Sequence, residues 1–201
     1  MWYNKENQRR DRMLNHTGTK VIETPRLILR PFKISDASMM YQNWASDDEV
    51  TKYLTWPTHS DIFVTKTILQ MWVEGYKNKD YYQWAIELKE TGEVIGSLSL
   101  FNINNHDENA EVGYCISRDY WNQGIVTEAF NGLIKLAFEE IGFARLTARH
   151  DVLNPASGRV MEKCGLTYEG TLRKISKNQA GQLVDCKYYS ILKEEYDEKQ
   201  F

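Results

Sequence analysis

The candidate functional residues lie in the second half of this sequence. Glu111 lies on a segment, Ala110 to Ser117, whose composition is typical of a strand. A short turn that contains Gly124 follows, and the apolar run after it has the spacing of a long helix. The first turn of a helix leaves backbone N–H groups unpaired and carries the positive end of the helix dipole. The segment from Trp121 to Val126 is therefore predicted to bind an anion such as a phosphate group.

A second group of candidates stands at Asn154 and Ser157, on either side of Pro155. Both are ordinary residues for the start of a helix, so capping alone would explain them.

The elements that must position these residues follow from the spacing of apolar and turn-forming residues. We predict strands at about 23–32, 81–88, 94–101, 110–117, 144–149, 166–172 and 183–192. We predict helices at about 35–44, 61–76, 125–141 and 154–165, with Asp36 capping the first and Gly142 ending the third. These elements form one domain over residues 21–201. Residues 1–20 are predicted to be a polar, loosely packed N-terminal extension, or else an arm that binds a partner.

The composition argues against several classes of protein. With 25 basic and 28 acidic residues the net charge is −3, which gives no electrostatic case for binding nucleic acid. The apolar runs are far shorter than the roughly 20 residues of a membrane span, and the start has no apolar signal core, so we expect no membrane partner and a cytoplasmic location. Neither the three cysteines nor the four histidines have the spacing of a metal site. Whether the chain forms a homodimer stays open.

Four passages taken together resemble the GNAT superfamily of N-acetyltransferases, and within it the RimJ/RimL group. They are Thr24 to Arg30, Ala110 to Tyr114, Tyr120 to Ala129 and Asn154 to Leu166, and the resemblance spans roughly residues 22–195. It implies the α/β (α+β) GNAT fold, a central mixed, mostly antiparallel twisted sheet of about seven strands with about four helices. It also implies acetyl-CoA as cosubstrate, no metal, and direct transfer of acetyl to a primary amine.

The acceptor that the resemblance implies is the N-terminal amine of a protein, such as a ribosomal protein. Two other readings stay open. One keeps the chemistry but takes a small amine as acceptor, such as a polyamine, an amino acid or an antibiotic. The other is a non-catalytic module that binds acyl-CoA. Acceptor recognition is expected from residues 55–80, 102–109 and 173–185, where Asp185 could bind a cationic amine or pair with a neighbouring base.

The resemblance also assigns residues to the cosubstrate. The pyrophosphate loop would be Trp121, Asn122, Gln123, Gly124, Ile125 and Val126. Val126 stands where the family has a small residue. The site can survive this difference because it needs backbone amides rather than side chains, but the extra methyl groups could push the cosubstrate outward. The preceding strand, which bends away from its neighbour in this fold, often at a bulge, would bind the pantetheine arm and polarise the thioester through its backbone at Tyr114, Cys115 and Ile116.

The same comparison assigns the catalytic roles. Glu111 would be the general base that deprotonates the amine, a role suited to a carboxylate in a partly apolar cleft; the alternative is a hydrogen-bonded strand carboxylate. Some relatives place a Glu where Ser176 stands here, which shifts weight to Glu111 or to a water chain. Asn154 would hydrogen-bond the pantetheine or an ordered water, and Ser157 would protonate the departing thiolate. Cys115 and Cys164 lie in apolar patterns and are expected in the core rather than as acyl carriers.

Overall fold

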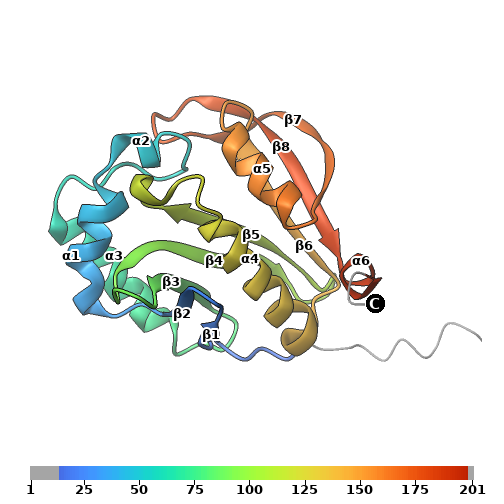
Figure 1. Ribbon diagram of the computed structural model, residues 1–201. Coiled ribbons are helices and arrows are strands. Elements are labelled where there is room, and N and C mark those ends of the chain that lie inside the picture. Colours follow the sequence, from blue (N-terminus) through green and yellow to red (C-terminus); the bar gives the residue numbers. More distant parts are fainter. Residues whose placement is uncertain (1–13, 199–201) are drawn as a thin grey trace, which may run out of the picture.

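Eight strands form one sheet in this computed structural model, which describes residues 14–198 (Figure 1). The spatial order is β1-β2-β3-β4-β5-β6-β8-β7. The strands are β1 Ile22–Glu23, β2 Leu27–Pro31, β3 Tyr82–Leu88, β4 Val94–Asn104, β5 Asn109–Ile116, β6 Arg145–Asp151, β7 Thr167–Lys177 and β8 Leu183–Leu192. All neighbours pair antiparallel except β5 and β6, which are parallel. The predicted mixed, mostly antiparallel sheet is confirmed, and the two-residue β1 is the strand that the sequence did not reveal.

Four substantial helical segments accompany the sheet, as predicted. The helices are α1 Ala37–Met40, α2 Asp48–Thr51, α3 Ile62–Gly75, α4 Ile125–Leu136, α5 Pro155–Lys163 and α6 Lys193–Glu198. A 3-10 turn precedes α1 and a π-helical turn follows it, so that segment runs from Ile34 to Ala45; α4 likewise continues as a π turn to Ile141. Gly142 ends it with φ 93°, a left-handed conformation that glycine adopts without strain. No helix in the described range is long and apolar enough to cross a membrane.

The helices cover the two faces of the sheet unequally. Side chains alternate across β3, so Trp84 and Ile86 join the larger core cluster with α4 and α5, while Ala85 joins a second cluster with α1 and α3. Figure 1 shows α4 and α5 side by side on one face and α1 with α3 around the other end of the sheet. The β6, β8 and β7 part of the second face lies beyond these two helices.

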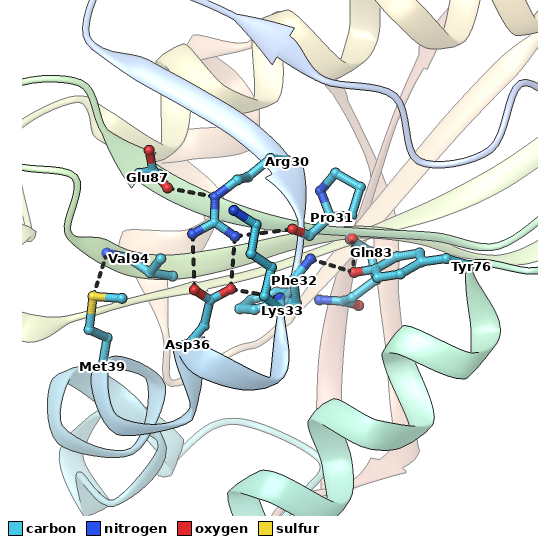
Figure 2. Close-up of polar contacts among 10 residues, drawn as sticks. All are labelled: Arg30, Pro31, Phe32, Lys33, Asp36, Met39, Tyr76, Gln83, Glu87 and Val94. Atoms are coloured by element: carbon cyan, nitrogen blue, oxygen red, sulfur yellow. Dashed lines mark hydrogen bonds and ion pairs between the residues drawn. The ribbon is translucent and has the colours of Figure 1, made fainter.

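A buried ion network fixes α1 to the sheet. Figure 2 shows the Arg30 guanidinium between the carboxylates of Asp36 and Glu87; its Nη1 lies 2.8 Å from an Asp36 oxygen. Tyr76, at the end of α3, accepts the Phe32 N–H at 2.8 Å in the same region. The Asp36 carboxylate, predicted to cap the first helix, accepts the Lys33 backbone N–H at 2.8 Å at the start of that segment and also pairs with Arg30, because a buried guanidinium needs a counter-charge. Removing Arg30 would leave two carboxylates unpaired, at a cost of about 3–5 kcal/mol.

The first described residues are packed, contrary to the prediction for residues 1–20. The Asn15 N–H donates to the Ile141 carbonyl and the Gly18 N–H to the Lys79 carbonyl, both at 2.8 Å. The Trp84 indole N–H donates to the Lys20 carbonyl at 2.6 Å. Residues 14–20 therefore belong to the domain, held by backbone hydrogen bonds that a polar composition does not reveal. Residues 1–13 lie outside the described residues.

Candidate active site

β5 and β6 pair over only part of their length. Their register runs from Asn109 opposite Arg145 to Glu111 opposite Thr147, although β5 continues to Ile116 and β6 to Asp151. The two strands therefore separate after Glu111, which leaves the β6-facing backbone groups of β5 without a ladder partner. The expected bulge is on β4 rather than β5: the β4–β5 register shifts between Phe101 and Asn104.

Strand alternation shows which β5 amides are freed. The Ser117 N–H donates to the Ile95 carbonyl of the β4 side at 2.8 Å. In an antiparallel ladder the direction of the N–H alternates, so the N–H of Cys115 also faces β4, whereas those of Tyr114 and Ile116 face the opening. Of the three expected backbone donors, the structure thus presents Tyr114 and Ile116. The Trp121 indole N–H donates to the Ile116 carbonyl at 3.1 Å and occupies that acceptor.

The loop before α4 concentrates unpaired N–H groups. Asn122 and Gly124 are both left-handed, with φ 59° and 74°, which turns successive N–H groups toward one side. Glu128 is the first residue whose N–H finds a helical acceptor, the Gly124 carbonyl at 3.0 Å. Among the described residues, the N–H groups of residues 122–127 form no hydrogen bond. This geometry suits an anion at the helix N-terminus, as the sequence predicted.

Val126 does not face that loop. Its side chain is 8% exposed and belongs to the larger core cluster with Ile125. The methyl groups of Val126 therefore point into the core rather than toward the loop, because the first turn of α4 directs this side chain inward. Only the backbone of Val126 remains at the anion site.

Asn154 and Ser157 stand at the start of α5. The Asn154 side-chain oxygen accepts the Ser157 N–H at 3.3 Å, so capping is real. The Ser157 hydroxyl lies 2.9 Å from the Tyr114 hydroxyl, which also donates to the Ser157 carbonyl at 3.0 Å. Burial raises the pKa of Tyr114, so the phenol stays protonated at neutral pH. The hydroxyl pair lies where β5 and α5 face each other across the opening.

Glu111 sits in an ionic setting rather than the partly apolar one expected. Its carboxylate is 2.9 Å from the Arg149 Nε, and the Asn102 side-chain amide donates to it at 3.0 Å. Arg149 in turn donates to the Tyr188 hydroxyl at 2.9 Å. The Glu111 side chain is 12% exposed and that of Arg149 26%. No local sequence pattern indicates Arg149, because Arg149 and Glu111 are brought together only by the register of β5 and β6.

The two catalytic candidates lie on opposite faces of β5. Alternation puts Tyr114 on the face of α4, where its ring centroid is 5.7 Å from that of Phe130. Glu111 points to the other face, the one that α1 and α3 cover only in part. There the Phe101 ring lies across Gly113, since a Cβ on Gly113 would stand 2.8 Å from it. Phe101, another residue missed in the sequence, is thus a wall beside Glu111.

The cysteines are packed, as expected. The Cys115 Sγ lies 3.3 Å from the Ser97 hydroxyl, and burial raises the pKa of its thiol to about 11. Burial likewise raises the pKa of Cys164 to about 12. Thiols of this kind are poor nucleophiles at neutral pH. No group of three or more His, Cys, Asp or Glu residues that could hold a metal occurs within residues 14–198.

The β7–β8 hairpin contains residues 173–185, one of the segments expected to recognise the acceptor. Its tip reaches the loop before α3, where the Thr58 hydroxyl lies 3.4 Å from the Gln179 side-chain oxygen. Asp185 accepts the Lys174 N–H at 2.8 Å and so braces the hairpin. Trp84 and Tyr82 are buried in the core, as the sequence suggested.

Comparisons with known proteins identify the family of this chain. The family model described as an acetyltransferase (GNAT) domain matches residues 26–167. The chain is 33% identical over 181 residues to the N-acetyltransferase p20 of Bacillus licheniformis, itself uncharacterised, covering 88% of this chain and 98% of that one. It is 32% identical over 141 residues to YdaF of Bacillus subtilis, whose name proposes a ribosomal N-acetyltransferase, covering 70% and 75%. The crystal structure of a GNAT acetyltransferase from Bacillus anthracis superposes with a TM-score of 0.77 at 26% identity, covering 88% and 100%.

Proposed function

Because this chain belongs to the GNAT family of N-acetyltransferases, with acetyl-CoA as cosubstrate, we propose that it acetylates the N-terminal amine of a protein. The name of the YdaF relative supports a protein acceptor. The observation that carries the site assignment is the separation of β5 from β6, which frees two backbone amides between a hydroxyl pair and a carboxylate.

The cosubstrate would lie in the opening between β5 and β6. The unpaired N–H groups of residues 122–127 would hold the pyrophosphate, with Trp121 beside them. The side-chain amide of Asn154, whose oxygen caps α5, would meet the pantetheine arm. The N–H groups of Tyr114 and Ile116 would donate to the thioester oxygen as negative charge develops there; one such donor is typically worth about 10²–10³ in kcat. Neither the backbone N–H nor the thiol of Cys115 would contact the thioester, and this residue would only connect Tyr114 and Ile116 in the strand.

The proton transfers fall to residues on the two faces of β5. Ser157 would give its hydroxyl proton to the departing thiolate and take up a proton from water after the thiol leaves, while the Tyr114 hydroxyl, 2.9 Å away, would stay protonated and hold the Ser157 hydroxyl in place. Glu111 would accept the proton of the incoming ammonium, directly or through water. Arg149 would hold the Glu111 carboxylate in place, since its Nε lies 2.9 Å away. No side chain is acylated in this scheme, in keeping with the buried, protonated thiols of Cys115 and Cys164.

The acceptor is tested by release of free thiol from acetyl-CoA. The panel contains lysine-bearing peptides with a free N-terminus and the same peptides with a formylated N-terminus. It also contains small amines: a polyamine, free amino acids and an aminoglycoside. We expect turnover only with the free N-termini. Turnover of the formylated peptides would assign the enzyme to lysine side chains, and turnover of small amines with all peptides inert would assign it to them; either result overturns the proposal.

A further inference from the structure

One of the four family-like passages, Thr24 to Arg30, has no role in the site described so far. Its first residues contact the back of the pyrophosphate loop. The Glu128 carboxylate, in the first turns of α4, accepts the Thr24 hydroxyl at 2.6 Å, the Arg26 N–H at 2.8 Å and the Arg26 Nε at 2.6 Å. The Arg26 Nη1 donates to the Gln123 carbonyl at 3.0 Å. Thr24, Arg26 and Glu128, hereafter the Arg26 cluster, thus join the corner between β1 and β2 to the loop.

The loop needs support from outside. The N-cap residue of α4 is Gly124, which has no side chain, so the cap hydrogen bond found in α3 and α5 is missing here. The N–H groups of residues 122–127 that would otherwise stabilise the turn are left unpaired among the described residues. Asn122 is held left-handed, a conformation unfavourable for most residues that are not glycine. An anion site built in this way must be held through its carbonyl and side-chain groups, and Gln123 and Glu128 provide these.

Charge gives Arg26 a second role. Glu128 lies one turn from the unpaired N–H groups, and a carboxylate there would repel a phosphate group. The Arg26 Nε at 2.6 Å neutralises it. The Glu128 side chain is 16% exposed and that of Arg26 48%, so the carboxylate is the more buried partner and the guanidinium lies toward solvent. Losing Arg26 would therefore both loosen Gln123 and leave an uncompensated negative charge beside the phosphate site.

We infer that Thr24, Arg26 and Glu128 are positioning residues for the CoA pyrophosphate, which act through the loop and through the neutralisation of Glu128. This inference rests on the proposed placement of the pyrophosphate at residues 122–127. It does not depend on the identity of the acceptor. It also gives a role to the hydrogen bonds that Thr24 and Arg26 donate to the Glu128 carboxylate.

Equilibrium binding tests the inference without any acceptor. CoA and pantetheine, which lacks the phosphates, are titrated into the wild-type protein, Arg26→Gln, Glu128→Gln and the double variant. We expect the Kd of CoA to rise about tenfold in Arg26→Gln, the equivalent of one charged hydrogen bond, with the Kd of pantetheine unchanged. In the double variant part of that loss should be restored, because the uncompensated carboxylate is gone. Glu140→Gln, which breaks the exposed Lys20–Glu140 pair at the far end of the same helical segment, is the matched control and should leave both constants unchanged.

Several results would overturn the inference. Equal weakening of CoA and pantetheine in Arg26→Gln would indicate general damage to the fold. An unchanged Kd of CoA would show that the loop holds its shape without Arg26. A wild-type protein that binds CoA no more tightly than pantetheine would remove the pyrophosphate from this loop altogether. Failure of the acceptor panel, by contrast, leaves these binding constants unaffected.

Discussion

The pair of Glu111 and Arg149 offers a direct test of the proposed base. Glu111→Gln keeps the shape of the side chain but removes the charge that faces Arg149 Nε at 2.9 Å. Arg149→Gln removes the other partner and leaves the carboxylate with the Asn102 amide. A hydrogen bond to a charged group contributes about 1.5–3 kcal/mol. Since the two side chains are 12% and 26% exposed, solvent screens part of this, and we expect each variant to lose about 1–2 kcal/mol of unfolding free energy.

Activity separates the two explanations of Glu111, because stability changes by a similar amount in both variants. A general base contributes about 10²–10⁴ to the rate, so Glu111→Gln should lower kcat by at least about 10². Arg149→Gln keeps the carboxylate and should lower kcat by about tenfold or less, the equivalent of one charged hydrogen bond.

The assay is thiol release at saturating acetyl-CoA and peptide, with urea unfolding of each variant as the stability control. Both variants must be fully folded at the assay temperature for the comparison to count. Equal losses of kcat in the two variants would refute the reasoning and make Glu111 a structural carboxylate that holds β5 to β6. The base would then be a water chain.

Three further outcomes follow from the same contacts. Tyr114→Phe should lower kcat about tenfold or more and leave the KM of acetyl-CoA little changed, and the double variant Tyr114→Phe, Ser157→Ala should be no slower than Ser157→Ala alone. Tyr196→Phe, which removes a hydroxyl that contacts Glu139, is the control. Additive losses of kcat in the double variant would show that the two hydroxyls act independently. Gly158→Ala should lower the unfolding free energy in urea by about 1–3 kcal/mol, although Ala has the better helix propensity, because its Cβ would stand 2.7 Å from His150 Nε2. The same substitution in a His150→Ala background should carry no such cost. A Gly158→Ala protein more stable than the wild type would contradict this packing. Burial lowers the pKa of His150 in the folded protein, so the unfolded chain binds this proton first as the pH falls. The contribution of His150 to the unfolding free energy should be fully retained above about pH 6.5 and fall below it by up to about 1.4 kcal/mol per pH unit. Burial lowers the pKa of His59 in the same way, so His150→Gln should reduce the slope of the wild-type protein without abolishing it, and an unchanged slope would exclude His150 as a source.

Local chemistry explains the part of the fold that the sequence predicted. The second helix, predicted at about residues 61–76, is such a case: α3 begins at Ile62, where the Asp61 carboxylate accepts the N–H groups of Phe63 and Val64 at 2.8 and 3.1 Å. The turn at Gly124 and the end of the helix at Gly142 follow likewise from conformations that glycine favours. These signals lie within a few residues of the feature they determine.

Contacts across the sheet explain most of what the sequence missed. Arg149 meets Glu111 only because β5 and β6 pair in one register and then separate, and no local pattern encodes that register. The direction of the Cys115 amide depends likewise on the β4–β5 ladder. The direction of the Val126 side chain could not be predicted for a related reason. The motif shows that this residue follows the glycine turn, but it does not show which way the side chain points. Asp36 was predicted as a cap, and the choice of Arg30 as its partner depends on the packing of α1 against β2.

The arrangement of β5 bears on the order of chemical events. Its backbone would supply the oxyanion donors in the plane of the sheet, the hydroxyl pair lies on one face, and Glu111 lies on the other. An acceptor amine that reaches Glu111 would therefore approach the thioester carbonyl from the face opposite the group that protonates the sulfur. Both substrates can occupy such a site together, and neither must leave before the other enters, whereas a route through an acylated cysteine would need a thiol exposed between them. The protonated, packed thiols of Cys115 and Cys164 do not provide one. Direct transfer within a ternary complex is the mechanism that this division of β5 supports, and initial-rate lines that intersect, rather than run parallel, are the kinetic result expected from it.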